Sequence, residues 1–298
     1  MNSNFGDRLA AAVRAKRSAV CVGLDPRFSS LPTALTSGVA LNDYASMAAA
    51  TKQFCVEVID AVADLVAIVK PQAAFFELLG PYGMQCLAEV MQYAHHRGLL
   101  VLLDAKRGDI GTTAEAYAQA YLGTDSAWGG DALTVNPFLG DDTLVPFVSR
   151  ASATGTGLFV LVKTSNPGSS YLQDLSCPEG HVYDRLAGTV QKLAHDSCGS
   201  SGYGAIGAVT GATYPEELAR LRSQMPSAWL LIPGYGAQGA GASEVAAGFD
   251  DQGMGAIVNS SRGIIFAYGA PSAAGPNWQD SVRQAAEIMR AELPKPHA

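Results

Sequence analysis

The sequence has few charged residues and no long apolar run. Aspartate, glutamate, lysine and arginine together make up 16% of the 298 residues, against about 25% in an average soluble domain. No apolar run approaches the ~18 residues that a membrane-spanning helix needs, and residues 1–8 contain no apolar segment of a secretory signal. The composition therefore favours a compact, well-buried protein over a disordered, fibrous or membrane-spanning chain.

Cysteines and positive charges are also few. The cysteines are odd in number and form no C-x-x-C pair, which favours reduced thiols in the cytoplasm. The five are Cys21, Cys55, Cys86, Cys177 and Cys198. With 20 basic and 27 acidic residues the net charge is −7, so an anionic substrate would need a local positive pocket. We expect a soluble cytoplasmic protein without nucleic-acid or membrane partners.

Several common catalytic motifs are absent. The sequence contains no G-x-S-x-G and no H-E-x-x-H segment, which argues against an α/β-hydrolase and a zinc protease. Its Gly-rich segment at 234–239 comes late in the chain and lacks the following acidic residue of a dinucleotide-binding fold. We therefore predict neither a metal site nor a nicotinamide cofactor.

The sequence does contain a regular alternation of short apolar runs with helical patterns. Apolar runs without polar alternation are typical of parallel strands that are covered on both faces. We predict strands at 19–24, 65–69, 99–103, 132–135, 157–162, 205–209, 229–232 and 256–258. We predict helices at 5–16, 44–64, 82–97, 113–122, 141–150, 182–195, 215–222, 243–249 and 279–293.

Eight strand–helix units predict an α/β fold of the (β/α)8 (TIM) barrel type, although the pattern alone leaves a doubly wound open sheet possible. We expect residues 1–298 to form a single domain. The helix at 5–16 would plug the barrel from below, and an extended tail from about 268 to 298 would follow the last strand. Residues 165–180 form a long polar segment, which we interpret as a mobile loop.

Residues 99–113 combine a predicted buried strand with a cluster of charges. The apolar run leads into Asp104-Ala-Lys106-Arg-Gly-Asp109-Ile-Gly-Thr-Thr113. The two-residue period of a strand points Asp104 and Lys106 to the same face, and Asp109 follows in the turn. Burying charges is costly unless they are paired. Because packing gives no reason for these charges, we predict the active site here.

Other polar residues directly follow the predicted strands, where the active sites of barrels lie. The positions at these strand ends are Asp25, Lys70, Asp104, Lys106, Asn136, Lys163, Ser165, 233–238 and Arg262. The Gly-rich segments 234–238 and 260–263 follow the last two strands, the usual phosphate site of this fold. Free backbone N–H groups opposite the Arg262 guanidinium predict a phosphate site.

The charges around Lys106 restrict its chemistry. Neighbouring carboxylates favour its charged ammonium form, whereas a Schiff-base lysine needs a lowered pKa. A charged ammonium can donate a proton or stabilise a carbanion. Metal binding by Asp104 and Asp109 is disfavoured because lysines lie where the cation would be.

Six segments, taken in order, resemble the motifs of the orotidine 5′-phosphate decarboxylase family, in its longer bacterial branch (type 2). These segments are residues 22–27, 69–77, 104–113, 162–168, 233–239 and 259–263. The resemblance spans residues 18 to 267. It implies the decarboxylation of orotidine 5′-phosphate to UMP and CO2, the last step of pyrimidine synthesis. The reaction would need no cofactor and would proceed through a carbanion at C6 that Lys106 protonates.

The resemblance also implies roles for individual residues. Lys70, Asp104, Lys106 and Asp109 would form a charged tetrad. Asp109 and Thr113 would cross into the active site of a second subunit and contact ribose there, which makes the protein a homodimer. Other positions implied to bind substrate are Asp25 (with Lys70, ribose), Ser165 (pyrimidine), and Pro233, Gly234, Gly236, Gln238, Arg262 and Gly263 (phosphate).

Two other functions remain open. A related barrel lyase could act on a sugar phosphate with a divalent metal, but it would need an acidic ligand where Lys70 stands, and a chelator would inhibit it. A non-catalytic relative could bind UMP as a sensor, but it would have no use for paired charges that reduce stability.

Overall fold

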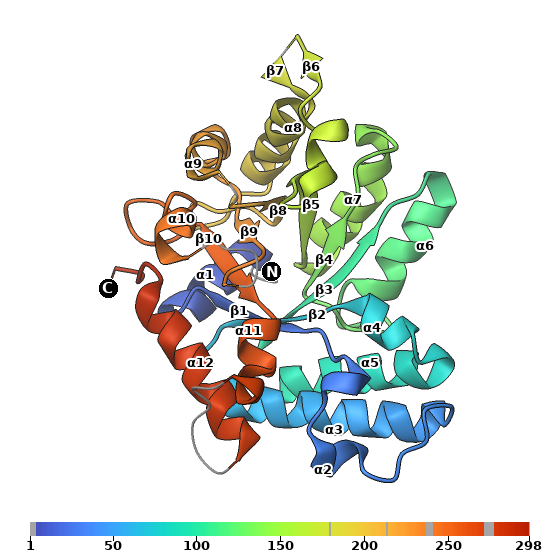
Figure 1. Cartoon of the computed structure of the whole chain (residues 1–298). Helices are drawn as coiled ribbons and strands as arrows, with labels where there is room; N and C mark the ends of the chain where they lie inside the picture. Colours follow the sequence, from blue (N-terminus) through green and yellow to red (C-terminus); the bar gives the residue numbers. More distant parts are fainter. Residues whose placement is uncertain (1–3, 179, 213, 237–240, 271–276, 298) are drawn as a thin grey trace.

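The computed structural model describes residues 4–178, 180–212, 214–236, 241–270 and 277–297. In this part of the chain, eight parallel strands close into a barrel in the order β1-β10-β9-β8-β5-β4-β3-β2, with helices around it (Figure 1). This confirms the predicted (β/α)8 barrel. The barrel strands are β1 (Val20–Leu24), β2 (Ile68–Pro71), β3 (Leu100–Arg107), β4 (Ala132–Val135), β5 (Gly157–Lys163), β8 (Ile206–Thr210), β9 (Leu230–Ile232) and β10 (Ala256–Ser260).

The α-helices are α1 (Phe5–Lys16), α2 (Thr33–Thr36), α3 (Tyr44–Val62), α4 (Ala73–Glu77), α5 (Gly80–His96), α6 (Gly111–Tyr121), α7 (Val145–Thr154), α8 (Val182–Asp196), α9 (Pro215–Gln224), α10 (Ala242–Ala246), α11 (Arg262–Ile265) and α12 (Trp278–Glu292). Short 3₁₀ helices are η1 (Phe28–Ser30), η2 (Asp141–Leu144), η3 (Pro167–Tyr171) and η4 (Ala267–Gly269). None of the helices in the described ranges is long and apolar enough to cross a membrane.

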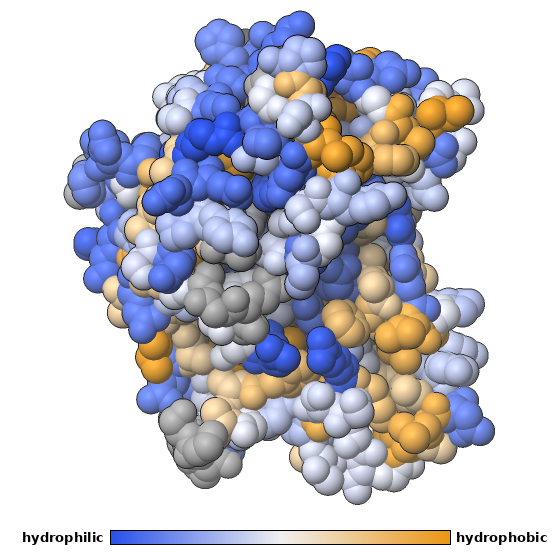
Figure 2. Space-filling view, turned by 45° about the horizontal axis from the view of Figure 1, so that its top comes forward, coloured by the Kyte–Doolittle hydropathy of each residue, from blue (hydrophilic) through white to orange (hydrophobic). Residues whose placement is uncertain are grey.

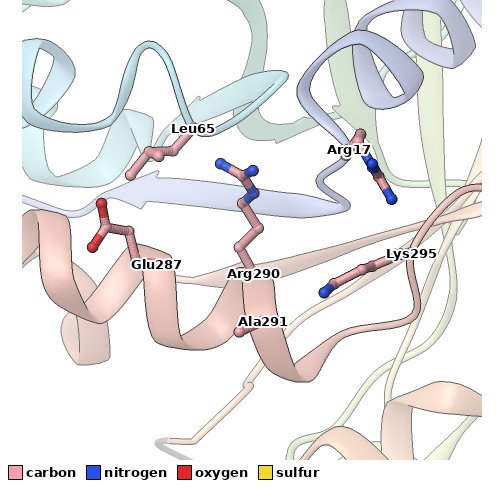
Figure 3. Close-up of a pocket in the computed structure, with 6 residues that line it drawn as sticks. All are labelled: Arg17, Leu65, Glu287, Arg290, Ala291 and Lys295. Atoms are coloured by element: carbon pink, nitrogen blue, oxygen red, sulfur yellow. The ribbon is translucent and has the colours of Figure 1, made fainter.

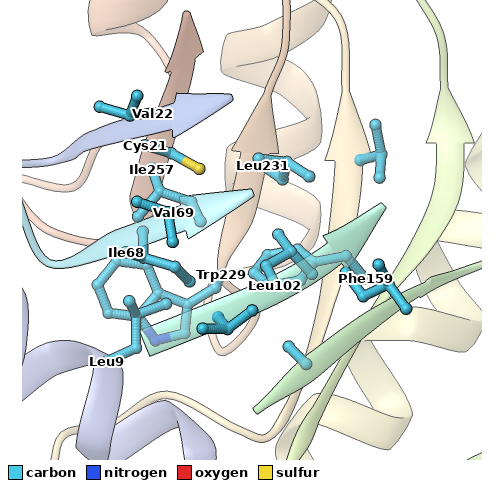
Figure 4. Close-up of a cluster of buried hydrophobic side chains, with 14 of the residues drawn as sticks. Leu9, Cys21, Val22, Ile68, Val69, Leu102, Phe159, Trp229, Leu231 and Ile257 are labelled. Atoms are coloured by element: carbon cyan, nitrogen blue, oxygen red, sulfur yellow. The ribbon is translucent and has the colours of Figure 1, made fainter. Parts of the chain in front are cut away.

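The core lies inside the barrel and between the barrel and its helices. Nearly all barrel-strand residues are buried on both faces, which explains why the strands are continuous apolar runs. Side chains from six strands gather with Leu9 and Trp229 in Figure 4. Phe5 packs edge-on against Phe159, with ring centroids 6.1 Å apart, and the Trp229 indole donates to the Gly6 carbonyl over 3.3 Å. Helix α1 therefore closes the barrel from below, as predicted.

Asp131, just before β4, joins three elements at this lower end. Its carboxylate accepts hydrogen bonds from Arg8 of α1 (2.6 Å), His95 of α5 (2.9 Å) and the backbone N–H of Val101 in β3 (2.9 Å). Although burial alone raises the pKa of Asp131, these donors outweigh burial and hold the pKa below its ordinary value.

The segment after residue 268 is more than a tail. Helix α12 packs along α3 (Figure 1), where Trp278 stacks on Phe54 with ring centroids 5.1 Å apart. Phe266 also stacks on Phe54, with ring centroids 5.6 Å apart. Stacked aromatic rings of this kind bury large apolar areas, so the C-terminal helix is part of the hydrophobic core.

Three local expectations were wrong. Residues 65–67 belong to the turn after α3, and β2 begins only at Ile68, so Lys70 lies inside the strand beside Gly23 of β1. Strand β3 extends beyond the apolar run at 99–103 and continues through Arg107, so Asp104 and Lys106 lie on the strand, as their two-residue spacing assumed. The 165–180 segment, expected to be one long polar loop, contains η3 and a two-stranded hairpin, β6 (Ser176–Cys177) and β7 (Gly180–His181).

Candidate active site

Asp104 is the centre of a hydrogen-bonded cluster at the carboxyl ends of the strands. Its Oδ2 accepts from Lys70 Nζ at 2.7 Å and from Gln72 Nε2 at 2.9 Å. Its Oδ1 accepts from Lys106 Nζ at 2.6 Å and from Thr134 Oγ1 at 3.0 Å. The carboxylate therefore joins β2, β3 and β4 and holds two ammonium groups on opposite sides.

Burial and charge act against each other in this cluster. Burial alone raises the pKa of Asp104, but the ammonium groups of Lys70 and Lys106 outweigh burial and hold the pKa well below its usual range. For Lys70, burial alone lowers the pKa, but Asp104 and Asp25 outweigh it and raise the pKa. The charge on each of Lys70, Asp104 and Asp25 affects the pKa of the other two. Asp104 and Lys70 are both charged at neutral pH.

The two lysines differ in access. The Lys70 side chain is 5% exposed, whereas the Lys106 side chain is 47% exposed. Both ammonium groups are held by the same carboxylate, so their positions are fixed relative to each other. Lys106 is therefore the cation that a ligand can reach, and Lys70 is the buried cation behind it.

The backbone places Lys106 through a bulge. Pairing between β3 and β4 shifts register between Leu103 and Arg107, and Lys106 has φ of +48°, in the left-handed region that non-glycine residues rarely adopt. The backbone N–H groups of Ala105 and Lys106 both donate to Thr134 Oγ1, over 3.0 and 2.9 Å. Bulges commonly redirect a side chain beside an active site, and here the bulge brings Lys106 over Asp104.

Asp25 and Asn259 present acceptor atoms without a partner. The Oδ1 atom of each is buried and has no hydrogen bond within the described residues. Burial raises the pKa of Asp25, although Lys70 and a hydrogen bond from Ser261 partly offset the effect. Gly23 allows this close packing, because a β-carbon there would lie 1.9 Å from Ser261 Oγ. Buried polar atoms in proteins nearly always have a hydrogen-bond partner, so these two acceptors could receive a donor from a bound ligand.

Asp109 and Thr113 lie apart from this cluster. Asp109 is half-buried and its Oδ1 accepts from the backbone N–H of Ile110 at 2.8 Å. Thr113 is exposed on the first turn of α6. Among the described residues, no hydrogen bond or ion pair joins Asp109 to Lys70, Asp104 or Lys106. The structure of one chain thus brings together three of the four predicted tetrad residues.

Ser165 follows β5 and packs against Gly211, where a β-carbon would lie 3.1 Å from the Ser165 backbone. The segment after it is held by two contacts: Lys163 forms an ion pair with Asp174, and Gln173 accepts from the Thr164 backbone N–H at 2.9 Å. The Lys163 ammonium also lies 4.8 Å from the centre of the Tyr183 ring. A cavity of about 320 Å³ borders Lys163 and Ser165.

The predicted phosphate loops follow β9 and β10, as expected. Gly234 and Gly236 have φ of +88° and +74°, conformations that glycine adopts freely and that occur in turns whose backbone N–H groups bind anions. Pro233 is half-buried between β9 and these glycines, Tyr235 donates its hydroxyl to Glu292 of α12, and Arg262 and Gly263 are exposed at the start of α11. Gln238 lies outside the described residues.

Sequence reasoning missed three residues of the site. Gln72 and Thr134 both donate to Asp104, and Asn259 presents a buried acceptor. Each of these three residues is a polar residue in an apolar strand or directly after one, and this position could have identified them from the sequence. Within the described ranges no group of three or more His, Cys, Asp and Glu residues could hold a metal ion.

The fold and the site together define a class: a (β/α)8 barrel with a charged cluster at the strand ends and glycine-rich loops after the last two strands. Residues 18–275 match the model of the orotidine 5′-phosphate decarboxylase / HUMPS family. The chain belongs to this family.

Relatives match over nearly the whole length. The chain is 52% identical to orotidine 5′-phosphate decarboxylase of Rhodopirellula baltica, covering 97% of this chain and 98% of the relative. It is 44% identical to the enzyme of the same name from Deinococcus radiodurans, with 98% of each covered. The solved structure of Leishmania donovani OMP decarboxylase is 34% identical, with a TM-score of 0.73 and coverage of 97% and 98%.

Proposed function

We propose that this chain converts orotidine 5′-phosphate to UMP and CO2. The observation that carries the proposal is the Lys70–Asp104–Lys106 cluster, in which a buried carboxylate holds a reachable ammonium group at 2.6 Å. Family membership and relatives that carry the name of this enzyme support the substrate. The activity is that of a carboxy-lyase.

In the proposed mechanism Lys106 acts on C6 of the pyrimidine. The bond between C6 and the carboxylate breaks, its electron pair stays on C6, and CO2 leaves. The Lys106 ammonium stabilises the developing negative charge and then gives its proton to C6. The lysine becomes a neutral amine and regains a proton from solvent, so no cofactor or metal is consumed.

Asp104 has two proposed roles. It orients Lys106 and Lys70 through the hydrogen bonds described above. Its negative charge also lies beside the substrate carboxylate and repels it in the bound state, and this repulsion ends as neutral CO2 departs. The low pKa of Asp104 keeps this negative charge in place throughout the neutral pH range.

The remaining site residues would bind the nucleotide. Asp25 and Lys70 would bind a ribose hydroxyl, for which the buried Asp25 Oδ1 is a free acceptor in the described structure. Ser165 would contact the pyrimidine. Phosphate would be held by Arg262, Gln238 and the backbone at Pro233, Gly234, Gly236 and Gly263. Binding energy from the phosphate, which is remote from C6, would position the base for reaction.

We also propose that the active unit is a homodimer in which Asp109 and Thr113 enter the partner's site. Large apolar side chains are exposed around these residues, including Leu78, Ile110 and Phe138, which are 71%, 62% and 71% exposed. Figure 2 shows hydrophobic residues gathered on its right-hand side, where Figure 1 places α4, α5 and α6. Exposed apolar patches of this kind mark interaction surfaces.

The cytoplasm is the proposed location. All five cysteines are unpaired, and three of them are buried. Burial raises the pKa of Cys21 and Cys86 to about 12, which makes these thiols unreactive. Cysteines without disulfides are typical of a reducing compartment.

The decisive experiment is an absorbance assay for the loss of orotidine 5′-phosphate. Lys106→Ala should lower kcat by about 10³-fold or more, because it removes both the proton donor and the positive charge beside C6. The variant should still bind UMP. Lys192→Ala, which removes an exposed lysine on α8, is the matched control and should keep full activity.

A chelator should leave the activity of the unaltered protein unchanged. Near-normal turnover by Lys106→Ala would refute the mechanism, and inhibition by the chelator would favour the metal-dependent lyase.

Mixing inactive variants tests the shared site. Lys106→Ala mixed with Asp109→Ala should recover about a quarter of the wild-type activity, since half of the dimers are mixed and each of these carries one intact site. Equilibrium sedimentation should show the dimer at the same concentrations. A mixture that stays inactive while mixed dimers form would contradict the crossing of Asp109.

A further inference from the structure

A second cleft lies at the end of the barrel opposite the proposed active site. It has a volume of about 500 Å³ and lies between the end of α1, the turn after α3 and the C-terminal segment. Arg17 precedes β1 and Leu65 precedes β2, so the cleft is at the amino ends of the strands. The residues that line it are Arg17, Leu65, Glu287, Arg290, Ala291 and Lys295 (Figure 3).

Three cations from separate segments enter this cleft. Figure 3 shows Arg17 (just after α1), Arg290 of α12 and Lys295 of the C-terminal segment around the cleft, with the Glu287 carboxylate on the side of Arg290 away from Arg17 and Lys295. Within the described residues, no hydrogen bond or ion pair is made by these three side chains. Because three cations share the cleft with a single carboxylate, they repel one another, and a bound anion relieves this repulsion.

The nearest acidic groups are engaged elsewhere. Arg283 binds Asp64 through both of its terminal nitrogens, at 2.7 and 2.8 Å. Its Nε also lies 3.1 Å from the Glu287 carboxylate. Arg283, outside the cleft, thus pairs with both acids, and the three cations that line the cleft outnumber its one lining carboxylate, Glu287, in a chain whose net charge is −7.

The backbone holds the cations in place. Arg17 has φ of +48° and ends α1, with its N–H donating to the carbonyls of Arg14 and Val13. Lys16 beside it donates to the Ala63 carbonyl at 2.9 Å, which fixes the end of α1 against the end of α3. The left-handed conformation of Arg17 is that of a helix C-cap, so it fixes the point at which α1 ends and β1 follows.

The Lys295 backbone is fixed as well. It passes so close to Gly253 that a β-carbon there would lie 2.3 Å from the Lys295 carbonyl oxygen. The N–H of His297 donates to the Gln252 carbonyl at 2.9 Å. Three cations therefore line one cleft, and hydrogen bonds or close packing fix the backbone at two of them, Arg17 and Lys295.

We propose that this cleft binds a small polyanion through a di- or triphosphate group. Two guanidinium groups and one ammonium group can pair with several negatively charged phosphate oxygens at once. Arginine binds phosphate through paired hydrogen bonds. A single phosphate would leave part of the charge uncompensated. Leu65 and Ala291 give only a small apolar wall, so the site recognises the phosphate groups and not a base. The site is distinct from the proposed active site and does not depend on the proposed function.

Titration calorimetry with pyrophosphate, in magnesium-free buffer, tests this site. The full chain carrying Arg262→Gln is used as the background, because that substitution removes a cation of the other predicted phosphate site. We expect one pyrophosphate bound per chain, at least about tenfold tighter than inorganic phosphate. Adding Arg290→Gln or Arg17→Gln should weaken binding about tenfold each, the loss of one charge-assisted contact.

Lys192→Gln, which removes an exposed charge from α8, is the matched control and should leave binding within about twofold. The proposal is overturned if pyrophosphate gives no binding heat, if Arg262→Gln alone abolishes binding, or if binding survives combined replacement of all three cleft cations. Because these three side chains are at the surface, unfolding midpoints should stay unchanged, which separates lost binding from lost folding.

Discussion

Replacing Lys70 with methionine isolates the electrostatic cost of the buried cluster. Methionine keeps most of the apolar stem of lysine but removes the ammonium group. The ammonium forms a 2.7 Å ion pair with Asp104, and both side chains are less than a tenth exposed. The substitution therefore leaves a buried carboxylate that has lost one of its two cations, and it leaves Asp25 without the cation that partly offsets its burial.

The expected loss is about 3 kcal/mol in the free energy of unfolding at pH 7.5. Removing one partner of a buried ion pair costs about 3–5 kcal/mol. The lower end of this range applies because Asp104 keeps Lys106, Gln72 and Thr134 as donors. A loss of this size is a large fraction of the stability of a typical protein.

The loss should depend on pH. Without Lys70, burial raises the pKa of Asp25 further and that of Asp104 above its present low value. A carboxyl group whose pKa is higher in the folded than in the unfolded protein stabilises the fold when protonated, and this contribution is lost as pH rises through the folded pKa. Lys70→Met should therefore be closer to the unaltered protein in stability at pH 5 than at pH 8.

Urea unfolding followed by fluorescence from pH 5 to 8 measures both effects. The double variant Lys70→Met with Asp104→Asn is the control, because it removes the uncompensated charge and should recover part of the loss. A single variant that loses less than about 1 kcal/mol, with no pH dependence, would show that the buried pair contributes no more than a surface one.

Two further predictions concern other parts of the barrel. Asp131→Asn should lower the free energy of unfolding by about 2–3 kcal/mol at pH 7, because the carboxylate accepts three hydrogen bonds. Since the folded pKa of Asp131 is lowered, its contribution is present above the ordinary pKa and is lost as pH falls, so urea midpoints of the two proteins should converge below about pH 4. Lys163→Met should raise KM for orotidine 5′-phosphate about tenfold with a smaller change in kcat, because it releases Asp174 and the segment after Ser165. An unchanged KM would show that this ion pair does not position the segment.

The barrel could be predicted because each strand is a separate apolar run followed by a helical pattern. The start of β2 could not, since residues 65–67 are as apolar as the strand that follows them. For the site, the spacing of Asp104 and Lys106 predicted that they share a face; the two side chains do meet, at 2.6 Å, but a bulge and not regular alternation brings them together. The roles assigned to the substrate-binding residues stay predictions.

The bulge at Lys106 had no signal in the sequence. Its left-handed backbone depends on the Thr134 hydroxyl, which comes from a different strand and accepts two N–H groups at once. Gln72 was missed for a similar reason, because its contact with Asp104 depends on the register of β2. Local patterns predict which elements form, whereas contacts between elements decide which polar side chains meet.

The hydrogen bond from Tyr235 to Glu292 has a practical consequence for handling this protein. It links the glycine turn after β9 to the last turn of α12, six residues before the end of the chain. A change at the carboxyl terminus, such as an affinity tag, a fusion partner or a truncation, can therefore disturb Glu292 and, through its hydrogen bond to Tyr235, the proposed phosphate loop. Kinetic data from carboxyl-terminal fusions therefore need an untagged reference.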